Sequence, residues 1–313
     1  MSLYVSPSFY GLASVDSQSL QFLAAAQFCL YKVTVVHCRR KSDSPTGIIP
    51  SYVGENVQIT DFLEFVDHLR RQHSEIQLDS DLSDKDKILV EGFDALLKTR
   101  LVPALEQLFW LDEFNYAAMA SRMVSKTTAW PHYFFYLSKK RSEARKIVDR
   151  TGKMPEDLEL DAIKTLNLLA SKLGASKYFN GMKPSSLDAL IYGYLAPLYR
   201  LPMANDRLKL QLKALPNLAV FLETIGSIYS PVTDEDISDV KEFKKLMQEV
   251  DKAKKQVEKQ KMEKRMKERE QQKQESTNNT NVIMFCIFSL TATILFGIHS
   301  GIIQLPTVEE DVD

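Results

Sequence analysis

Histidine and cysteine are the residue types best suited to metal ligation and nucleophilic catalysis, and both are scattered in this sequence. His68 and His73 are five positions apart, which on a helix turns their side chains away from one another. The cysteines are odd in number and contain no C-x-x-C pair, so they form no disulfide framework. The full set is His37, His68, His73, His132, His299, Cys29, Cys38 and Cys286. We therefore predict no metal site and no cofactor, and we expect a reducing compartment.

Phosphate-binding loops are also missing from the sequence. Neither G-x-x-x-x-G-K-[ST] nor G-x-G-x-x-G occurs, which excludes nucleotide chemistry by those routes. Only 11 of the 313 residues are glycine, a shortage that favours a mostly helical protein. The formal net charge is −1, so no whole-molecule field favours nucleic acid as a partner.

The sharpest local signal is a helix start at Ser185. Asp188 stands three positions later, where its carboxylate can accept from the backbone N–H of Ser185. Such a box stabilises a helix end by about 1 kcal/mol. We therefore predict that Ser185 and Asp188 form a structural cap, which is a common device and not a functional site.

An aromatic segment runs from Trp130 to Tyr136. Its residues are Trp, Pro, His, Tyr, Phe, Phe and Tyr. A core segment is the favoured interpretation, and an exposed docking patch is the alternative. The basic residues 139–141 that follow are expected on a solvated helix face.

Residues 1–78 are predicted to form a small α/β domain. A β-branched run at 33–36 is typical of a buried strand. Pro50, at the start of a later strand, is a candidate cis-proline, although the pattern alone favours an ordinary trans proline at a sheet edge. Asp61 followed by Glu64 predicts a helix start. The expected order is strand 3–5, helix 16–31, strand 33–36, strand 47–53, strand 57–59 and helix 61–71.

Residues 79–230 are predicted to form an all-α domain. An acidic stretch, 79–86, is a plausible linker between the two domains. From residue 87 to 229 almost every segment has helical periodicity, interrupted by prolines and glycines. We expect six or seven helices there.

Residues 231–281 are predicted to form a charged helical spacer followed by a polar linker. Between 241 and 273 there are 13 Lys or Arg against 7 Asp or Glu, interleaved as in a solvated helix. Its first half carries a stripe at alternating spacings of three and four residues, which we interpret as a candidate partner face. This stripe includes Phe243, Leu246, Val250 and Val257.

Residues 282–303 are predicted to form a C-terminal transmembrane anchor. These 22 residues contain no Asp, Glu, Lys or Arg, and His299 is their one side chain that titrates near neutral pH. At about 1.5 Å per residue they span roughly 33 Å, enough for a hydrocarbon core of about 30 Å. A short acidic tail, 304–313, follows, and the basic residues precede the span. By the positive-inside rule we expect the N-terminal side in the cytosol.

The order of these elements resembles the glutathione transferase architecture. A β-α-β-β-β-α unit has G-x-x-P before its third strand, and an all-α domain follows with a late S-x-x-D box. Within that superfamily the chain is similar to the metaxins, in particular the membrane-anchored type. The motifs that carry the resemblance are at residues 11–16, 101–105, 109–116, 130–131 and 184–189.

This resemblance implies a fold and a cellular role. The fold is α+β and mostly α, with a thioredoxin-like N-terminal domain and an all-α C-terminal domain. The role implied is that of a non-enzymatic, cytosol-facing protein of the mitochondrial outer membrane, with its C-terminus in the intermembrane space. The implied partners are a second metaxin and the β-barrel insertion machinery, and motor adaptors for mitochondrial transport are a further implication. Because the tail is acidic, the endoplasmic reticulum stays open as an alternative membrane.

A membrane-anchored glutathione transferase is the rival hypothesis. That chemistry needs a hydroxyl or thiol near the end of the first strand and a Glu/Gln-Ser pair at the start of the helix after the proline strand. The resemblance places Asp61 and Phe62 at the position of that pair, and Phe62 cannot donate a hydrogen bond. The lost contact is worth roughly 1.5–3 kcal/mol. The four candidate hydroxyls do not single one residue out; they are Tyr4, Ser6, Ser8 and Tyr10.

Overall fold

The structure is a computed structural model of the 313-residue chain. It describes residues 1–72, 76–128, 130–229, 248–249, 252–253, 255–260, 262–267 and 283–293. Contacts within the chain divide it into two units, Met1–Asp251 and Lys252–Asp313, and each is treated by itself below.

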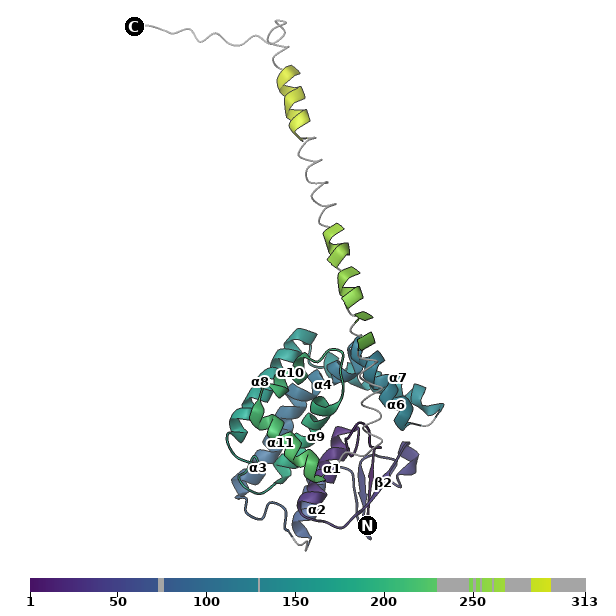
Figure 1. The fold of residues 1–313 in the computed structure, drawn as a ribbon, viewed down its shortest axis with the longest axis vertical. Coiled ribbons are helices and arrows are strands. Elements are labelled where there is room, and N and C mark those ends of the chain that lie inside the picture. The colour runs from purple at the N-terminus through teal and green to yellow at the C-terminus, as the bar shows by residue number, and fades with distance from the viewer. Residues whose placement is uncertain are drawn as a thin grey trace, which may run out of the picture. The chain divides into compact units, whose positions relative to one another are not determined.

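The first unit begins with a four-stranded sheet in the order β2-β1-β3-β4 (Figure 1). β1 pairs in parallel with β2 and antiparallel with β3, and β3 pairs antiparallel with β4. Leu3 and Val5 of β1 are fully buried, so the central strand anchors this part of the core. The elements are β1 (Ser2–Val5), α1 (Ser17–Phe28), β2 (Thr34–His37), β3 (Ser51–Val53), β4 (Gln58–Ile59) and α2 (Phe62–Arg71).

The strands and helices follow one another along the chain in the predicted order. However, β2 is not the buried strand that its composition predicts. It lies at an edge of the sheet, three of its four residues are exposed, and Val35 is 39% exposed. β-branched residues favour the extended backbone of a strand, and edge strands and central strands both have that backbone. Burial depends on what covers the strand, and a local run of residue types does not contain that information.

Pro50 stands directly before β3, and the Ile49–Pro50 peptide bond is cis. The trans form, which the local pattern alone favours, is therefore not the one found. A second cis bond joins Trp130 to Pro131. The first lies on the N-terminal domain beside the sheet, and the second lies between two helices of the C-terminal domain.

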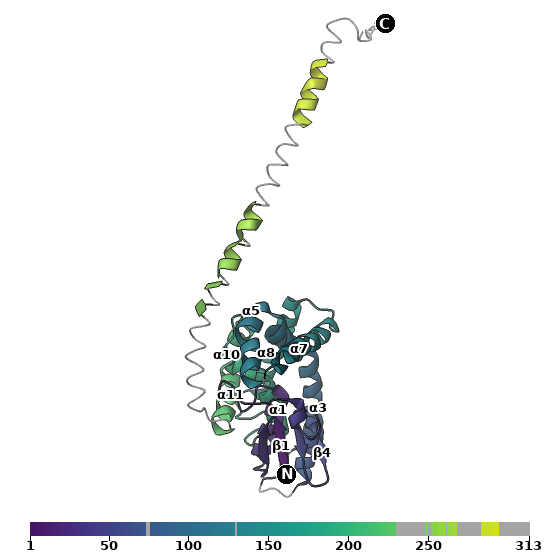
Figure 2. The ribbon, with the colours of Figure 1, turned by 90° about the vertical axis from the view of Figure 1, so that its right-hand side faces the viewer.

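The C-terminal domain is helical throughout its regular elements and lies beside the sheet domain (Figures 1 and 2). Three one-turn π-helical segments interrupt α-helix, so that 84–111 and 113–127 are each a continuous helical run. Counted in this way, the described part of 84–229 contains seven helical runs, in agreement with the expected six or seven. The segments are α3 (Asp84–Leu96), η2 (Leu97–Leu101), α4 (Val102–Glu106), η3 (Gln107–Leu111), α5 (Glu113–Asn115), η4 (Tyr116–Ala120), α6 (Ser121–Thr127), α7 (His132–Asp149), α8 (Pro155–Leu173), α9 (Ser186–Arg200), α10 (Arg207–Lys213) and α11 (Pro216–Tyr229).

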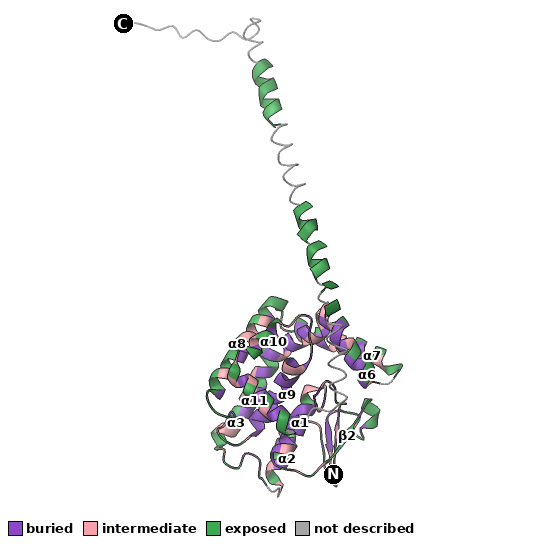
Figure 3. Ribbon diagram, viewed as in Figure 1, coloured by how far each residue is buried: buried purple, intermediate pink, exposed green. Residues whose placement is uncertain are grey.

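Helices α1 and α9 join the two domains at close range. Gly193 of α9 faces α1, and a Cβ atom added there would lie 2.6 Å from the carbonyl oxygen of Ser17. Gln21 of α1 donates a hydrogen bond from Nε2 to the carbonyl oxygen of Leu190, at 3.4 Å. Purple buried segments run through both helices in Figure 3. The interdomain core therefore depends on a position without a side chain.

The second unit is described only in part. Residues 252–253, 255–260 and 262–267 are helical and exposed, and Lys259 pairs with Glu263 at 4.0 Å. Residues 283–293, within the expected anchor, are also helical and exposed. Among the described residues no helix has both the length and the apolar character needed to cross a membrane.

Candidate functional site

Two adjoining hollows form a cleft between the domains, which we call the interdomain cleft. The first hollow, about 280 Å³, is lined by Ser6 after β1, by Ile48 and Ile49 before the cis-proline, and by α7. The second hollow, about 370 Å³, extends along α4, η3 and α9. The side chains that line both are Val15, Asp16, Gln18, Met123, Tyr136 and Lys140.

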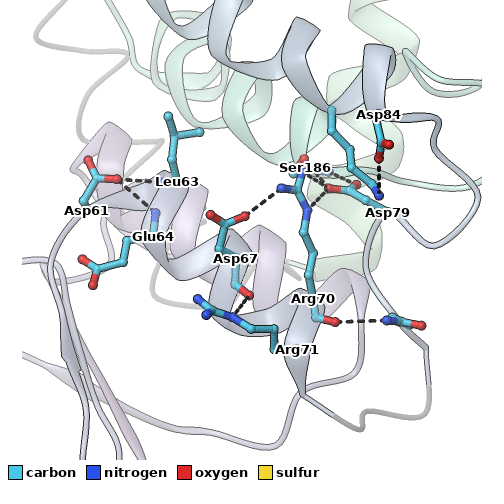
Figure 4. A network of polar contacts seen from close by, with 11 residues as sticks. Asp61, Leu63, Glu64, Asp67, Arg70, Arg71, Asp79, Asp84 and Ser186 are labelled. Atoms are coloured by element: carbon cyan, nitrogen blue, oxygen red, sulfur yellow. Dashed lines mark hydrogen bonds and ion pairs between the residues drawn. The ribbon is translucent and has the colours of Figure 1, made fainter.

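The position that the resemblance assigns to glutathione recognition is used by the fold itself. Asp61 caps α2, and its Oδ1 accepts from the backbone N–H groups of Leu63 at 2.9 Å and Glu64 at 3.1 Å (Figure 4). Phe62 is 7% exposed, and its ring centroid lies 6.0 Å from that of Phe22. Phe62 is thus a core residue. Neither side chain is placed to hold a ligand carboxylate and amine.

Of the four candidate hydroxyls, Ser6 is the one that lines the interdomain cleft. Its backbone is fixed on both sides. The N–H donates to Ser19 Oγ at 3.2 Å, and the carbonyl oxygen lies 3.3 Å from Nδ1 of His37. The histidine therefore contacts the main chain and not the hydroxyl. Ser6 therefore lines the cleft without an activating base from His37.

The thiol at the cleft is Cys38. It is buried, and its Sγ donates a weak hydrogen bond to the carbonyl oxygen of Val36 at 3.7 Å. Burial raises the pKa of this thiol, and the negative charge of Asp43 raises it further. A thiol with a raised pKa is a poor nucleophile at neutral pH, because the thiolate is the reactive form.

A charged cluster lies where the two hollows meet. Lys140 lies 5.9 Å from the ring centroid of Trp110. Burial lowers the pKa of Lys140, but the charge interactions with Tyr136, and then with Asp16, Glu106 and Glu143, outweigh burial and raise that pKa. Burial raises the pKa of Glu106 and that of Tyr136, although Lys140 opposes both shifts. The cluster therefore holds one ammonium group that the neighbouring acids keep charged.

A second polar network joins the domains at the start of α9, and Figure 4 shows it from close by. The carboxylate of Asp79 accepts from the Ser186 N–H at 2.8 Å and from Ser186 Oγ at 2.6 Å. It also accepts from Arg70, from Nη2 at 2.8 Å and Nε at 3.1 Å. The Asp79 side chain is fully buried. We call these three residues the interdomain clamp, because they tie α2, the linker and α9 together.

Sequence reasoning missed the interdomain clamp. Asp79 stands in the acidic stretch that was interpreted as a linker, and Ser186 follows the serine chosen as a cap. No local pattern joins them, since 107 positions separate the two residues. The signals available were the doubled serine at a helix start and an aspartate at the end of the first domain.

The predicted cap residues lie next to the clamp. Asp188 is fully buried, and its carboxylate accepts from the backbone N–H of Ser185 and from that of Phe179, both at 2.8 Å. Ser185 Oγ donates to the same carboxylate and accepts from Asn180 Nδ2 at 3.0 Å. Asp188 therefore holds the loop before α9 as well as the helix end.

The predicted partner face is described at one residue only. Phe243, Leu246 and Val250 lie outside the described residues. Val257 lies in a helical segment and is 37% exposed. Among the described residues no group of three or more histidine, cysteine or acidic side chains could hold a metal ion.

Comparison with known proteins adds family relationships to this geometry. Residues 19–141 match the family described as outer mitochondrial membrane transport complex protein (Tom37), and residues 162–225 match the glutathione S-transferase C-terminal domain. Among solved structures, the β-etherase LigF of Sphingobium is similar with a TM-score of 0.51 and 14% identity, covering 76% of this chain and 98% of its own. That likeness shows a shared fold, and the match of residues 162–225 identifies the fold as glutathione transferase-like.

Curated relatives extend the similarity along the chain. The metaxin-1 homolog of Caenorhabditis briggsae is 36% identical over 316 residues, which cover 100% of this chain and 99% of that protein. Human metaxin-1 is 30% identical, with 74% of this chain and 51% of the human protein covered. Metaxin-3 of Danio rerio is 30% identical, with 70% and 72% covered. The chain belongs to the metaxin family.

Proposed function

We propose that this protein is a non-enzymatic, cytosol-facing subunit of a mitochondrial outer-membrane transport complex, with a role in protein import and β-barrel assembly. Membership of the metaxin family supports this role. The observation that supports a non-enzymatic role is what the side chains do at the position where a transferase recognises glutathione. Asp61 caps its own helix, and Phe62 packs into the core against Phe22. In this protein the two side chains at the position where a transferase binds its substrate stabilise the fold instead.

A single C-terminal span, residues 282–303, is proposed to hold the protein in the outer membrane. The body would then face the cytosol, and residues 304–313 would lie in the intermembrane space. Support comes from the described helical part of the segment, whose large apolar side chains face outward. Ile283, Phe285 and Phe288 are 59%, 72% and 74% exposed. Side chains of this kind at high exposure are compatible with a lipid environment.

The proposed partners are a second metaxin and the β-barrel insertion machinery, and the protein is further proposed as an adaptor for mitochondrial transport by motors. The stripe that includes Phe243, Leu246, Val250 and Val257 is proposed as the partner face. Val257→Glu tests it, because a charge placed at an apolar interface must lose water on binding. We expect this variant to reduce co-purification of the outer-membrane partners. Met262→Glu, which changes another exposed residue of the same unit, is the matched control and should keep them.

A membrane-anchored glutathione transferase-like enzyme is the second candidate, because Ser6 and the loop before cis-Pro50 both line the interdomain cleft. The full chain in detergent tests it directly. We expect no retention on glutathione resin and no turnover of chlorodinitrobenzene above background. Saturable turnover that Ser6→Ala abolishes would establish the enzyme and overturn the non-enzymatic proposal.

A further inference from the structure

Three aromatic side chains are exposed together at the turn between α6 and α7. Trp130 is 78% exposed, Phe134 is 56% exposed and Phe135 is 75% exposed. We call these three residues the aromatic corner. The favoured prediction of a core segment is wrong for these three residues, which are exposed as the alternative expects; that they form a docking patch stays a prediction. Single exposed apolar residues are ordinary on a protein surface, whereas three large aromatic residues within six positions mark an interaction site.

The rest of the segment explains why these three residues point outward. Tyr133 and Tyr136 are partly buried against the core, and Leu137 is buried. One face of the first turns of α7 thus packs against the rest of the first unit. Phe135 occupies the opposite face, and Phe134 lies beside Tyr133 with ring centroids 3.8 Å apart. The corner is held in place by its buried neighbours and stands at the edge of the body (Figure 1).

Basic residues surround the aromatic corner. Between residues 121 and 149 there are seven Lys or Arg against two Asp or Glu, a net charge of +5 in a chain whose net charge is −1. Lys139, Arg145 and Lys146 are exposed along α7. At about 1.5 Å per residue, Lys139 lies about 6 Å along the helix from Phe135, and Lys146 about 17 Å. An apolar tip is thus followed, one turn away, by positive charge.

The size of the corner argues against a protein as its main occupant. Three aromatic side chains offer at most about 500 Å², since each buries roughly 150–250 Å² and none is fully exposed. A stable protein interface needs about 800 Å² from each partner. A bilayer surface has no such requirement. Tryptophan and phenylalanine favour the headgroup region, and lysine and arginine bind anionic phosphates.

We propose that the aromatic corner inserts into the headgroup region of an anionic bilayer, with Lys139 at the level of the phosphates. The proposal rests on the membrane location given under Proposed function. Together with the C-terminal anchor, the corner would fix the body against the membrane surface through a second contact. Such a contact restricts the orientation in which the body meets its partners.

The chain contains two tryptophans, and their surroundings make the proposal testable. Trp110 is 8% exposed and Trp130 is 78% exposed, so the difference between the wild type and Trp130→Phe isolates the emission of the corner. The full chain is reconstituted into phosphatidylcholine vesicles with and without phosphatidylinositol. Brominated acyl chains then quench a tryptophan that enters the bilayer, and acrylamide quenches one that stays in water.

We expect brominated lipid to quench the Trp130 emission. We expect acrylamide to quench that emission less in vesicles than in the full chain kept in detergent. Quenching by brominated lipid should increase severalfold when phosphatidylinositol is present, and Lys139→Glu should remove that increase. Phe135→Asp should abolish the quenching. Leu210→Asp, a change of another exposed apolar residue (56% exposed), is the matched control and should leave it unchanged. All variants should keep the melting temperature of the wild type, because each substituted side chain is exposed.

Two results would overturn the proposal. In the first, Trp130 stays accessible to acrylamide and unquenched by brominated lipid while the chain resists carbonate extraction. In the second, addition of outer-membrane proteins shields Trp130 from acrylamide but brominated lipid still does not quench it, which would assign the corner to a protein partner. Release of the chain by carbonate would contradict the proposed membrane anchor and not the proposal for the aromatic corner. Quenching by brominated lipid, measured before the extraction, would still test whether the aromatic corner enters the bilayer.

Discussion

The carboxylate of Asp188 makes both the helix cap that the sequence pattern predicts and a tertiary contact to the loop before α9. Its carboxylate accepts hydrogen bonds from Ser185 and Phe179 in a fully buried position. Burial raises its pKa to about 6, against the ordinary value of 3.8, although the hydrogen bonds from Ser185 and Phe179 oppose the shift. The folded protein therefore binds this proton more tightly than the unfolded chain does.

This difference predicts how stability depends on pH. A raised pKa in the folded state stabilises the fold below the unfolded pKa, near 3.8, and that contribution is lost as the pH rises through about 6. A shift of about two units corresponds to roughly 3 kcal/mol. We expect the unfolding free energy of the wild type, relative to that of Asp188→Asn, to fall by about 2–3 kcal/mol from pH 3.5 to pH 7. Urea unfolding of both proteins at both pH values measures it, and parallel curves would contradict the assignment.

Helices α1 and α9 show what the elements require of one another. A Cβ atom on Gly193 would lie 2.6 Å from the Ser17 carbonyl oxygen, and that atom belongs to backbone that cannot rotate away. Overpacking of this kind costs about 1–3 kcal/mol or more. We expect Gly193→Ala to lower the melting temperature by several degrees. Gly92 of α3 has no atom within 4 Å of an added Cβ, so Gly92→Ala is the matched control.

The control should change stability in the opposite direction. Replacing glycine by alanine in an open helical position stabilises a helix by about 0.5–1 kcal/mol. Thermal melts of the two variants therefore separate close packing from helix propensity. Equal effects of the two substitutions would show that α1 can move away from α9 at little cost.

Elements were predictable where local chemistry decides them. The period of the apolar residues and the Asp61 cap indicated α2, and the S-x-x-D spacing indicated the start of α9. The exposure of Val35 and of the aromatic corner was not predictable, because it depends on which element covers a residue and not on its type. Position 193 illustrates the same limit, since only the approach of α1 makes glycine necessary there.

At the scale of the whole molecule, the interdomain clamp joins α2, the linker and α9 through one buried carboxylate. The Asp79 carboxylate is the shared acceptor for Arg70 and Ser186. Asp79→Ala would leave the Ser186 N–H and the Nε and Nη2 of Arg70 without their acceptor, while Arg70 Nη1 would keep Asp67. Loss of one partner of a buried ion pair costs about 3–5 kcal/mol. We expect faster amide hydrogen exchange at the start of α9 and along α2.

The matched control for the clamp is Asp81→Ala. Asp81 pairs with Lys183 at 2.5 Å, also between the linker and the loop before α9, but both side chains are more than half exposed. Exposed pairs are screened by water and salt and contribute little. Hydrogen exchange followed by mass spectrometry should therefore distinguish the two variants. If Asp79→Ala and Asp81→Ala showed similar hydrogen exchange, the packing of α1 on α9, and not the interdomain clamp, would hold the domains together.

Topology is the remaining property of the whole molecule, and it connects the chain to its proposed place in the cell. The basic residues between 241 and 273 precede the apolar segment 282–303, and the tail after it has no Lys or Arg. The proposed topology, with the body in the cytosol, is the one that the positive-inside rule gives for this charge difference. We expect protease added to intact mitochondria to remove an N-terminal tag, and a chain ending at Thr280 to be released by carbonate. Imaging of a fluorescent fusion with and without residues 274–313 separates mitochondria from the endoplasmic reticulum, and an N-terminal tag protected until the outer membrane is opened would reverse the orientation.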